Sequence, residues 1–213
     1  VYILVSGKRA VGKDFVAAQL CKGMQQSRGL NKRGRCFVRR FADTVKELYA
    51  RDRNLDVTRL NSQDPQDRDF KESHRAELTK YFRTYLLRFS SPEERVLHVC
   101  SKLIQHVRES GGDEDGARGI AWVVVSDVRH AAELEWCKKN LGKVVSVRIE
   151  ATDAARARRG WAFDVDKDTD ATEVALDSYR SFDFTYHNDA DGETPVRAWL
   201  HDKLLPWIAI NLA

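Results

Sequence analysis

The stretch LVSGKRAVGKDF, residues 4–15, decides which fold this sequence predicts. Its Gly7, Gly12 and Lys13 match the spacing G-x-x-x-x-G-K-[ST] of a phosphate-binding loop. An apolar segment over residues 1–6 precedes the loop, and residues with helical spacing follow it, namely Val16, Leu20 and Met24. In a strand, loop and helix of this kind, backbone N–H groups and the positive helix end point at one position. The segment therefore predicts a triphosphate site in which Lys13 reaches the β- and γ-phosphates.

Asp14 occupies the eighth position of the motif, where such loops usually carry a Ser or Thr hydroxyl that binds magnesium. Magnesium prefers oxygen ligands, so a carboxylate can keep this role directly or through water. Its charge beside a polyphosphate would be offset by nearby cations, namely Lys8, Arg9 and Lys13. The alternative is that Asp14 is only an acidic residue of the kind favoured in the first turn of a helix.

Length and composition are those of an ordinary globular protein. With 213 residues, of which 42% are hydrophobic, the chain can form one sizeable α/β core. Its 36 basic and 32 acidic residues leave a mild positive excess, so a local cluster must bind any anionic ligand. We therefore expect no nucleic-acid partner. We also expect a soluble protein without a membrane partner, because no apolar run approaches the ~20 residues that crossing a bilayer requires.

The cysteines favour a reducing compartment. The chain has four, which are scattered without C-x-x-C spacing beside apolar residues: Cys21, Cys36, Cys100 and Cys137. They predict buried thiols and a cytosolic protein. A peroxisomal location stays open, although the final residues NLA do not form an S-K-L-type signal.

Strand and helix patterns alternate along most of the chain. After the first strand, four apolar segments predict further strands: CFVRRF (36–41), IAWVVV (120–125), VVSVRIE (144–150) and FDFTYH (182–187). Helical patterns separate most of them, which predicts parallel β-α-β units. Between residues 43 and 110 we expect helices only, with Asp43 as one cap and Ser91, Pro92 and Glu94 as a capping box. Residues 111–119 predict a loop, and Pro206 is expected to kink or end the last helix.

SDVRH, residues 126–130, directly follows one of these strands. Asp127 and Arg129 are therefore expected at the carboxyl end of a central strand, where open α/β sheets bind ligands. Arg129 can face an anion there. For Asp127 a helix N-cap is an alternative that is compatible with a ligand role.

RARRGWAF, residues 156–163, is a basic segment with helical spacing. Arg156 and Arg159 are three apart and so share a face, while Arg158 points elsewhere. Guanidinium groups hold phosphate oxygens in pairs, and Gly160 would let the backbone approach a ligand closely. A solvated basic face is the alternative. An acidic segment follows (DVDKDTDATE, residues 164–173), and within residues 152–180 the basic and acidic segments flank a polar region that we expect to be mobile.

Together and in this order, SGKRAVGKDF, SDVRH and RARRGWAF resemble the animal-type phosphomevalonate kinases, a branch of the nucleoside monophosphate kinase-like P-loop proteins. The resemblance extends from about Tyr2 to Asn188. It implies an α/β, three-layer αβα P-loop kinase fold with a central parallel sheet, a helical substrate-binding insert and an arginine-rich lid. One domain, residues 1–213, is expected, with its core at 1–42, 118–151 and 181–213, a helical substrate-binding region at about 43–110 and a lid at about 152–172.

The resemblance implies phosphoryl transfer from ATP to 5-phosphomevalonate, giving 5-diphosphomevalonate and ADP in the mevalonate pathway of isoprenoid and sterol synthesis. ATP and Mg²⁺ are the implied cofactors, a phosphorylated small molecule is the partner, and a monomer is expected. A nucleoside monophosphate kinase of the same architecture is one alternative. The other is a non-catalytic P-loop module or nucleic-acid binder that uses Arg156 to Arg159, whose affinity would fall steeply with salt.

Individual roles also follow from the resemblance. The catalytic residues would be Lys8, Lys13, Asp14 and Arg129, with Asp14 and Asp127 at the metal. Nucleotide contacts are expected from Gly7, Lys8, Arg9, Ala10, Val11, Gly12, Lys13, Asp14, Arg156, Arg159 and Asn188. Substrate contacts are expected from Lys71, Arg75, Arg129, His130, Arg148 and Gly160.

Some of these assignments stay open. His130 stands where the animal enzymes carry a second arginine, so this chain would bind substrate with one fewer permanent charge. Arg83 and Arg88 cannot be assigned to the site or the surface. For Asn188, a contact with the nucleotide base and a purely structural role in a turn are equally compatible with the sequence.

Overall fold

The computed structural model describes residues 1–26, 35–62, 64–110 and 122–212. The loop expected at 111–119 and most of the basic connection at 27–35 lie outside the described residues. The chain divides into two compact units, one formed by Val1–Arg40 with Val107–Ala213 and the other by Phe41–His106.

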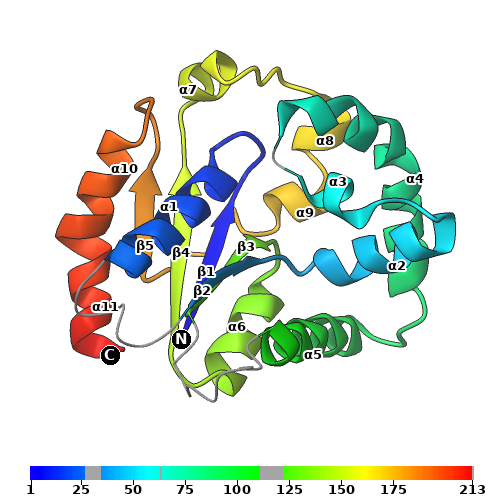
Figure 1. Ribbon diagram of the computed structural model, residues 1–213, viewed down its shortest axis with the longest axis horizontal. Coiled ribbons are helices and arrows are strands. Elements are labelled where there is room, and N and C mark those ends of the chain that lie inside the picture. Colours follow the sequence, from blue (N-terminus) through cyan, green and yellow to red (C-terminus); the bar gives the residue numbers. More distant parts are fainter. Residues whose placement is uncertain (27–34, 63, 111–121, 213) are drawn as a thin grey trace. The chain divides into compact units, whose positions relative to one another are not determined.

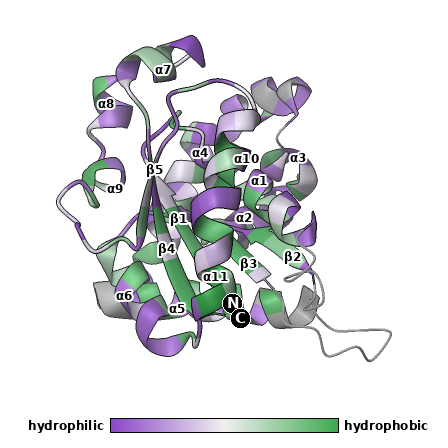
Figure 2. Ribbon diagram, turned by 90° about the vertical axis from the view of Figure 1, so that its left-hand side faces the viewer, coloured by the Kyte–Doolittle hydropathy of each residue, from purple (hydrophilic) through white to green (hydrophobic). Residues whose placement is uncertain are grey.

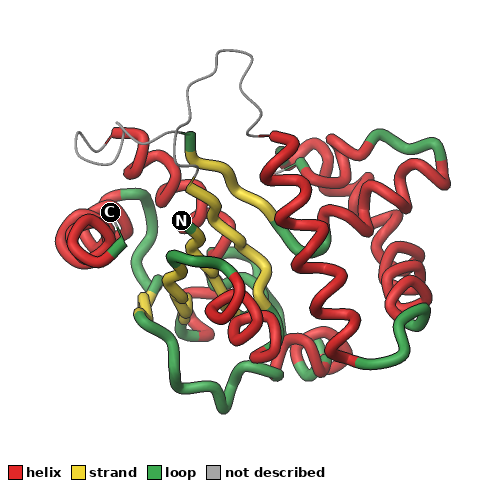
Figure 3. Tube along the Cα trace, turned by 90° about the horizontal axis from the view of Figure 1, so that it is seen from below, coloured by secondary structure: helices red, strands yellow, loops and turns green. Residues whose placement is uncertain are grey.

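The first unit is built on a five-stranded sheet with the order β2-β3-β1-β4-β5. Every neighbouring pair of strands is parallel, as the alternating pattern predicted. The strands are β1 (Tyr2–Gly7), β2 (Cys36–Arg39), β3 (Trp122–Val128), β4 (Val144–Glu150) and β5 (Phe184–His187) (Figures 1 and 3). Because β1 lies between β3 and β4, the loop that follows β1 is flanked by the carboxyl ends of both neighbours.

Helices cover both faces of this sheet. On one face, α1 (Lys13–Gln26), α10 (Thr194–Trp199) and α11 (Leu205–Asn211) pack against Ile3, Val5 and Val147. Leu4 is also buried but points to the opposite face, since strand residues alternate, and α6 (Ala131–Asn140) packs along β4. The central strands β1, β3 and β4 are accordingly rich in apolar residues, and Figure 2 shows much of their length in green. This is the three-layer αβα arrangement that was expected.

The carboxyl-terminal helix changes its winding, as the position of Pro206 suggested. A π-helical turn, η3 (Leu200–Leu204), separates α10 from α11, and Pro206 lies in the first turn of α11. Proline lacks the N–H group that would continue a regular ladder, so a local change of helix type at this point is expected. Trp199 and Leu200 pack against the core, as predicted.

The prediction for the cysteines is wrong for one pair. Cys21 in α1 and Cys36 at the start of β2 form a disulfide, with their Cα atoms 5.3 Å apart. Packing of α1 beside β2 brings the two sulfur atoms together, so no short sequence spacing is needed. Cys100 and Cys137 are buried, as expected. The cysteines therefore no longer argue for a reducing compartment.

The second unit is helical, as predicted. Its helices are α2 (Asp43–Arg53), α3 (Val57–Asn61), η2 (Pro65–Asp67), α4 (Arg68–Leu86) and α5 (Pro92–Ser110), the last of which continues past the unit's boundary. Tyr49, Ala50 and Leu60 form its buried cluster.

The two caps predicted for this unit have different outcomes. Ser91 and Glu94 form the capping hydrogen bonds of α5, in which Glu94 N–H donates to Ser91 Oγ and Ser90 N–H to Glu94. Asp43 does not cap α2, because the helix already begins at this residue and Ala42 is the N-cap. No helix in the described ranges is both long enough and apolar enough to cross a bilayer.

Candidate active site

The loop between β1 and α1 has the left-handed backbone positions that a tight phosphate-binding turn requires. Ala10 has φ of 62° and Gly12 has φ of 86°. A Cβ atom at Gly12 would also lie 2.5 Å from Asn188 Nδ2, so glycine is needed here for conformation and for space. Val11 between them is buried and anchors the loop in the core.

Asn188, just after β5, supports this loop from behind. Its side chain is buried, and Nδ2 donates to the Val11 carbonyl oxygen over 2.8 Å. Arg159 donates to the carbonyl oxygens of Asn188, at 2.6 Å, and Val11, at 3.4 Å. The structure thus gives Asn188 a loop-holding contact that neither sequence-based alternative included.

Lys13 lies at the centre of a cluster of charged groups. Burial lowers the pKa of Lys13, and the nearby Arg129 lowers it further, whereas three carboxylates raise it: Asp14, Glu173 and Asp127. These groups come from the start of α1, from β3, from the segment after β3 and from α9 (Ala171–Val174). Residues that are far apart in the sequence therefore act on one ammonium group, as the strand order makes possible.

Asp14 faces the carboxyl end of β3. Its Oδ1 accepts a hydrogen bond from the buried Ser126 hydroxyl over 3.0 Å and lies 3.6 Å from Arg40 Nη2. Asp127, in β3, is only partly buried. Two carboxylates beside a phosphate-binding loop form a donor set that suits magnesium. The part of the chain that the structure describes contains no cluster of three or more potential metal ligands.

Arg129 is held in place by a residue that the sequence analysis missed. The buried Glu133 accepts the backbone N–H groups of Arg129, at 2.8 Å, and His130, at 3.0 Å. Burial raises the pKa of Glu133 to about 7, although these two hydrogen bonds oppose the shift. His130 is the N-cap of α6, so the N-cap alternative for Asp127 is wrong. The pattern H-x-x-E lacks the Ser or Thr of a capping box, which is why Glu133 was not recognised.

The arginine-rich segment forms α7 (Asp153–Arg158) and the turn that follows it. Arg156 is buried, donates to the Arg9 carbonyl oxygen over 3.0 Å and lies 3.7 Å from the centre of the Trp161 ring. Arg159 also turns toward the loop, whereas Arg158 donates to the Asp189 carbonyl oxygen on an exposed side. Arg156 and Arg159 therefore share a face, as predicted. The Arg156 side chain on this face is buried, so the alternative of a solvated basic face does not hold for it.

Gly160 follows this face with φ of 80°. No atom beyond its chain neighbours would lie within 4 Å of a Cβ here, so conformation alone restricts the position in the described structure. The predicted approach of a ligand to Gly160 stays a prediction.

A cavity of about 430 Å³ opens beside the loop. Among its lining residues are the basic side chains of Lys8, Arg148 and Arg156 and the aromatic rings of Tyr179 and Phe182. Arg148 projects from β4, where it donates to Ser6 Oγ over 3.0 Å. The lining includes four of the predicted site residues, namely Lys8, Val11, Arg148 and Arg156.

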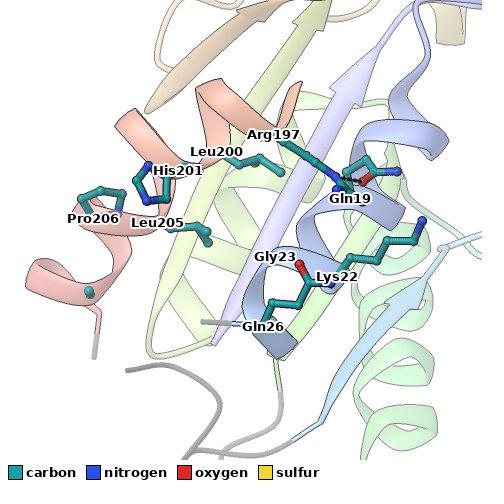
Figure 4. A pocket seen from close by; sticks show the side chains of 10 residues that line it. Gln19, Lys22, Gly23, Gln26, Arg197, Leu200, His201, Leu205 and Pro206 are labelled. Carbon is teal, nitrogen blue, oxygen red and sulfur yellow. Dashed lines mark hydrogen bonds between the residues drawn. The ribbon is translucent and has the colours of Figure 1, made fainter. Parts of the chain in front are cut away.

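A larger cavity, of about 540 Å³, lies away from the loop between α1 and the carboxyl-terminal helices (Figure 4). Gln19 and Lys22 line it from α1, and Arg197 and His201 from the opposite side. None of the predicted site residues belongs to its lining. Size alone therefore does not identify the site.

Lys71 and Arg75 belong to the second unit. On α4, Lys71 donates to the Ser62 carbonyl oxygen over 2.7 Å, and Arg75 pairs with Glu72 at 2.7 Å. Their assignment to the substrate stays a prediction.

A parallel sheet, a glycine loop between its first strand and first helix, a partly buried lysine at the start of that helix and an arginine-rich segment beside the loop define a P-loop kinase. The model of the family described as phosphomevalonate kinase matches residues 5–143, and the chain belongs to this family. It is an enzyme that uses ATP as co-substrate.

Two similar proteins illustrate the relationship. The phosphomevalonate kinase of Drosophila melanogaster is 26% identical over 208 residues, which cover 95% of each chain. The structure of shikimate kinase from Acinetobacter baumannii in complex with shikimate matches with a TM-score of 0.46 and 14% identity, covering 100% of this chain and 95% of that one.

The raised pKa of Glu133 predicts a pH-dependent stability. The pKa is about 7 in the folded protein against a usual value of 4.5. The contribution of this carboxyl group to the stability of the fold is therefore complete below about pH 4.5 and is lost as pH rises through 7. Glu133→Gln stays neutral and does not lose this stability. The difference in unfolding free energy between the variant and the parent should therefore shift by roughly 2 kcal/mol in favour of the variant as pH rises from 5 to 8. Urea unfolding at several pH values measures this.

The exposed Glu135 of the same helix provides the control. Glu135→Gln should follow the parent's pH profile. Parallel profiles for the parent and Glu133→Gln would show that Glu133 is ionised in the folded protein at all of these pH values.

Proposed function

We propose that the protein transfers the γ-phosphoryl group of ATP to the phosphate of 5-phosphomevalonate, giving 5-diphosphomevalonate and ADP in the mevalonate pathway. The observation that carries this proposal is the convergence of the loop, Lys13 and Arg129 at the carboxyl ends of β1 and β3. Membership of the phosphomevalonate kinase family and the Drosophila melanogaster relative of that name support the choice of acceptor.

The chemistry asks for positioning more than for a base. The acceptor oxygen belongs to a phosphate that is already anionic, so a strong general base is not required. The main barrier arises from the repulsion between two anions that must be aligned for transfer. Fixed cations and N–H groups lower this barrier. Lys13 and the loop would hold the β- and γ-phosphates, and Arg129 the acceptor phosphate.

The remaining cations would surround these groups. Lys8 and Arg148 would complete the binding of phosphate charge on one side of the loop, because both line the cavity beside it. Arg156 and Arg159 would act from the lid, where they already contact the backbone of the loop. Bidentate guanidinium contacts of this kind suit the spread of charge during phosphoryl transfer.

Asp14 and Asp127 would hold magnesium, directly or through water. When bound, the ion would neutralise phosphate oxygens as charge develops on them. Within the protein, the Ser126 hydroxyl orients Asp14 through its hydrogen bond.

An ADP-release assay across acceptors tests the proposal. We expect turnover with 5-phosphomevalonate to exceed that with AMP, other nucleoside monophosphates and mevalonate. Lys13→Met should then lower kcat roughly 100-fold with little change in the acceptor KM, because the ammonium interaction strengthens in the transition state. A faster reaction with a nucleoside monophosphate would contradict the acceptor, and a parent-like kcat would remove Lys13 from the site.

Asp14 predicts a graded response to substitution. Asp14→Asn removes the charge and should raise the magnesium concentration needed for half-maximal rate. Asp14→Ser restores the common hydroxyl and should keep more activity than Asp14→Ala, which offers no oxygen. Steady-state rates over a magnesium series measure the order. Equal activity of the Ser and Ala variants at an unchanged magnesium requirement would leave Asp14 only a helix-start residue.

A further inference from the structure

Residues 164–177 place three acidic side chains against the cations of the site: Asp168, Glu173 and Asp177. Each carboxylate contacts one residue of the loop and one arginine outside it. The segment comprises α8 (Val165–Asp168), α9 and the residues that follow, and Figure 2 shows α7, α8 and α9 in succession beyond the sheet. The acidic segment is therefore part of the site rather than a separate polar region.

Glu173 makes the contacts that a phosphate group would make. Its Oε2 accepts the backbone N–H of Arg9 over 2.9 Å, and its Oε1 accepts from Arg129 Nη1 over 2.6 Å. The side chain is only 11% exposed, so water competes little for these donors. A loop N–H group and a guanidinium are the donors with which proteins bind phosphoryl oxygens. The carboxylate occupies donors that the proposed function gives to substrate.

The other two carboxylates differ from Glu173 in their surroundings. Asp168 pairs with Arg9 and Arg156 but also accepts from Trp161 Nε1 and the Asp164 N–H group, which tie it to its own segment. Asp177 pairs with Lys8 at 2.6 Å and with Arg148 at 3.2 Å, and its side chain is 40% exposed. Asp168 and Glu173 are both well buried, and of these two only Glu173 has its hydrogen bonds to the loop backbone and Arg129.

We propose that Glu173 is the internal counter-anion of the subsite formed by the Arg9 N–H group and Arg129, and that a phosphoryl group must displace it. This inference rests on the proposed function, because it treats those donors as phosphate ligands. A phosphoryl group and a carboxylate on the same donors would repel each other strongly, because the largely buried Glu173 side chain is poorly screened by water. Binding of the anion therefore includes release of Glu173, and Glu173 lowers the affinity for substrate.

Inorganic pyrophosphate tests this competition without turnover. Isothermal titration compares its Kd for the parent and for Glu173→Gln, whose neutral amide keeps the size but loses the charge. We expect the variant to bind roughly tenfold more tightly, the equivalent of losing one charge-assisted hydrogen bond that competes with the ligand.

Asp166→Asn is the matched control. Asp166 lies on the same segment, is exposed and forms no ion pair with any residue that the structure describes. Asp166→Asn removes the same charge, so it measures how far the loss of one negative charge changes pyrophosphate binding from a distance. Salt screens such an effect, so the Kd of this variant for pyrophosphate should stay within about twofold of the parent's. Pyrophosphate binding by Glu173→Gln that is equal to or weaker than the parent's would overturn the proposal.

A second measurement uses the parent alone and does not depend on the variant's folding. Hydrogen exchange followed by mass spectrometry should show faster exchange of residues 171–177 when pyrophosphate is bound, because α9 loses its contact with the loop. Slower or unchanged exchange there would contradict displacement. Failure of the parent to phosphorylate 5-phosphomevalonate would refute the proposed function and leave the pyrophosphate comparison intact, so the two proposals fail separately.

Discussion

Repulsion between like charges around the phosphate-binding loop is the constraint on which the rest of the site depends. Lys8, Arg9 and Lys13 lie in one turn of the chain, and Arg129 lies close enough to lower the pKa of Lys13. Such a cluster is stable only when anions compensate it. Three carboxylates of residues 164–177 do so in the structure, and the phosphates of two substrates would do so in the proposed reaction. The same cations thus stabilise the fold of that segment and create the site.

The sheet determines where this charge accumulates. Its central strand β1 delivers the loop, and its neighbour β3 delivers Asp127 and Arg129 at the same edge. Burial on both faces makes the sheet a rigid support for these positions. The loop itself is held from behind, because Asn188 occupies the space that a side chain at Gly12 would need. Glu133 serves Arg129 in a similar way by fixing its backbone.

Local patterns predicted much of this structure, and contacts between distant residues explain what they missed. All five strands and the loop appear in the sequence because apolar alternation and glycine spacing are local properties. The disulfide of Cys21 and Cys36 depends on how α1 packs beside β2, and Glu173 meets Arg9 across 164 residues of sequence. The acidic segment could be recognised by composition, but its ion pairs could not. Glu133 was missed because His130 is an unusual partner in a capping position.

The most direct test of this account is a crystal structure of the protein with ADP and 5-phosphomevalonate. If substrate phosphates replace the carboxylates as the anions around the loop, the acceptor phosphate bonds to Arg129. The Glu173 carboxylate has then left both Arg129 and the Arg9 N–H group. The account is contradicted if Glu173 keeps both hydrogen bonds while the phosphates bind elsewhere, because the cations around the loop would then not be the ligands of the transferred group.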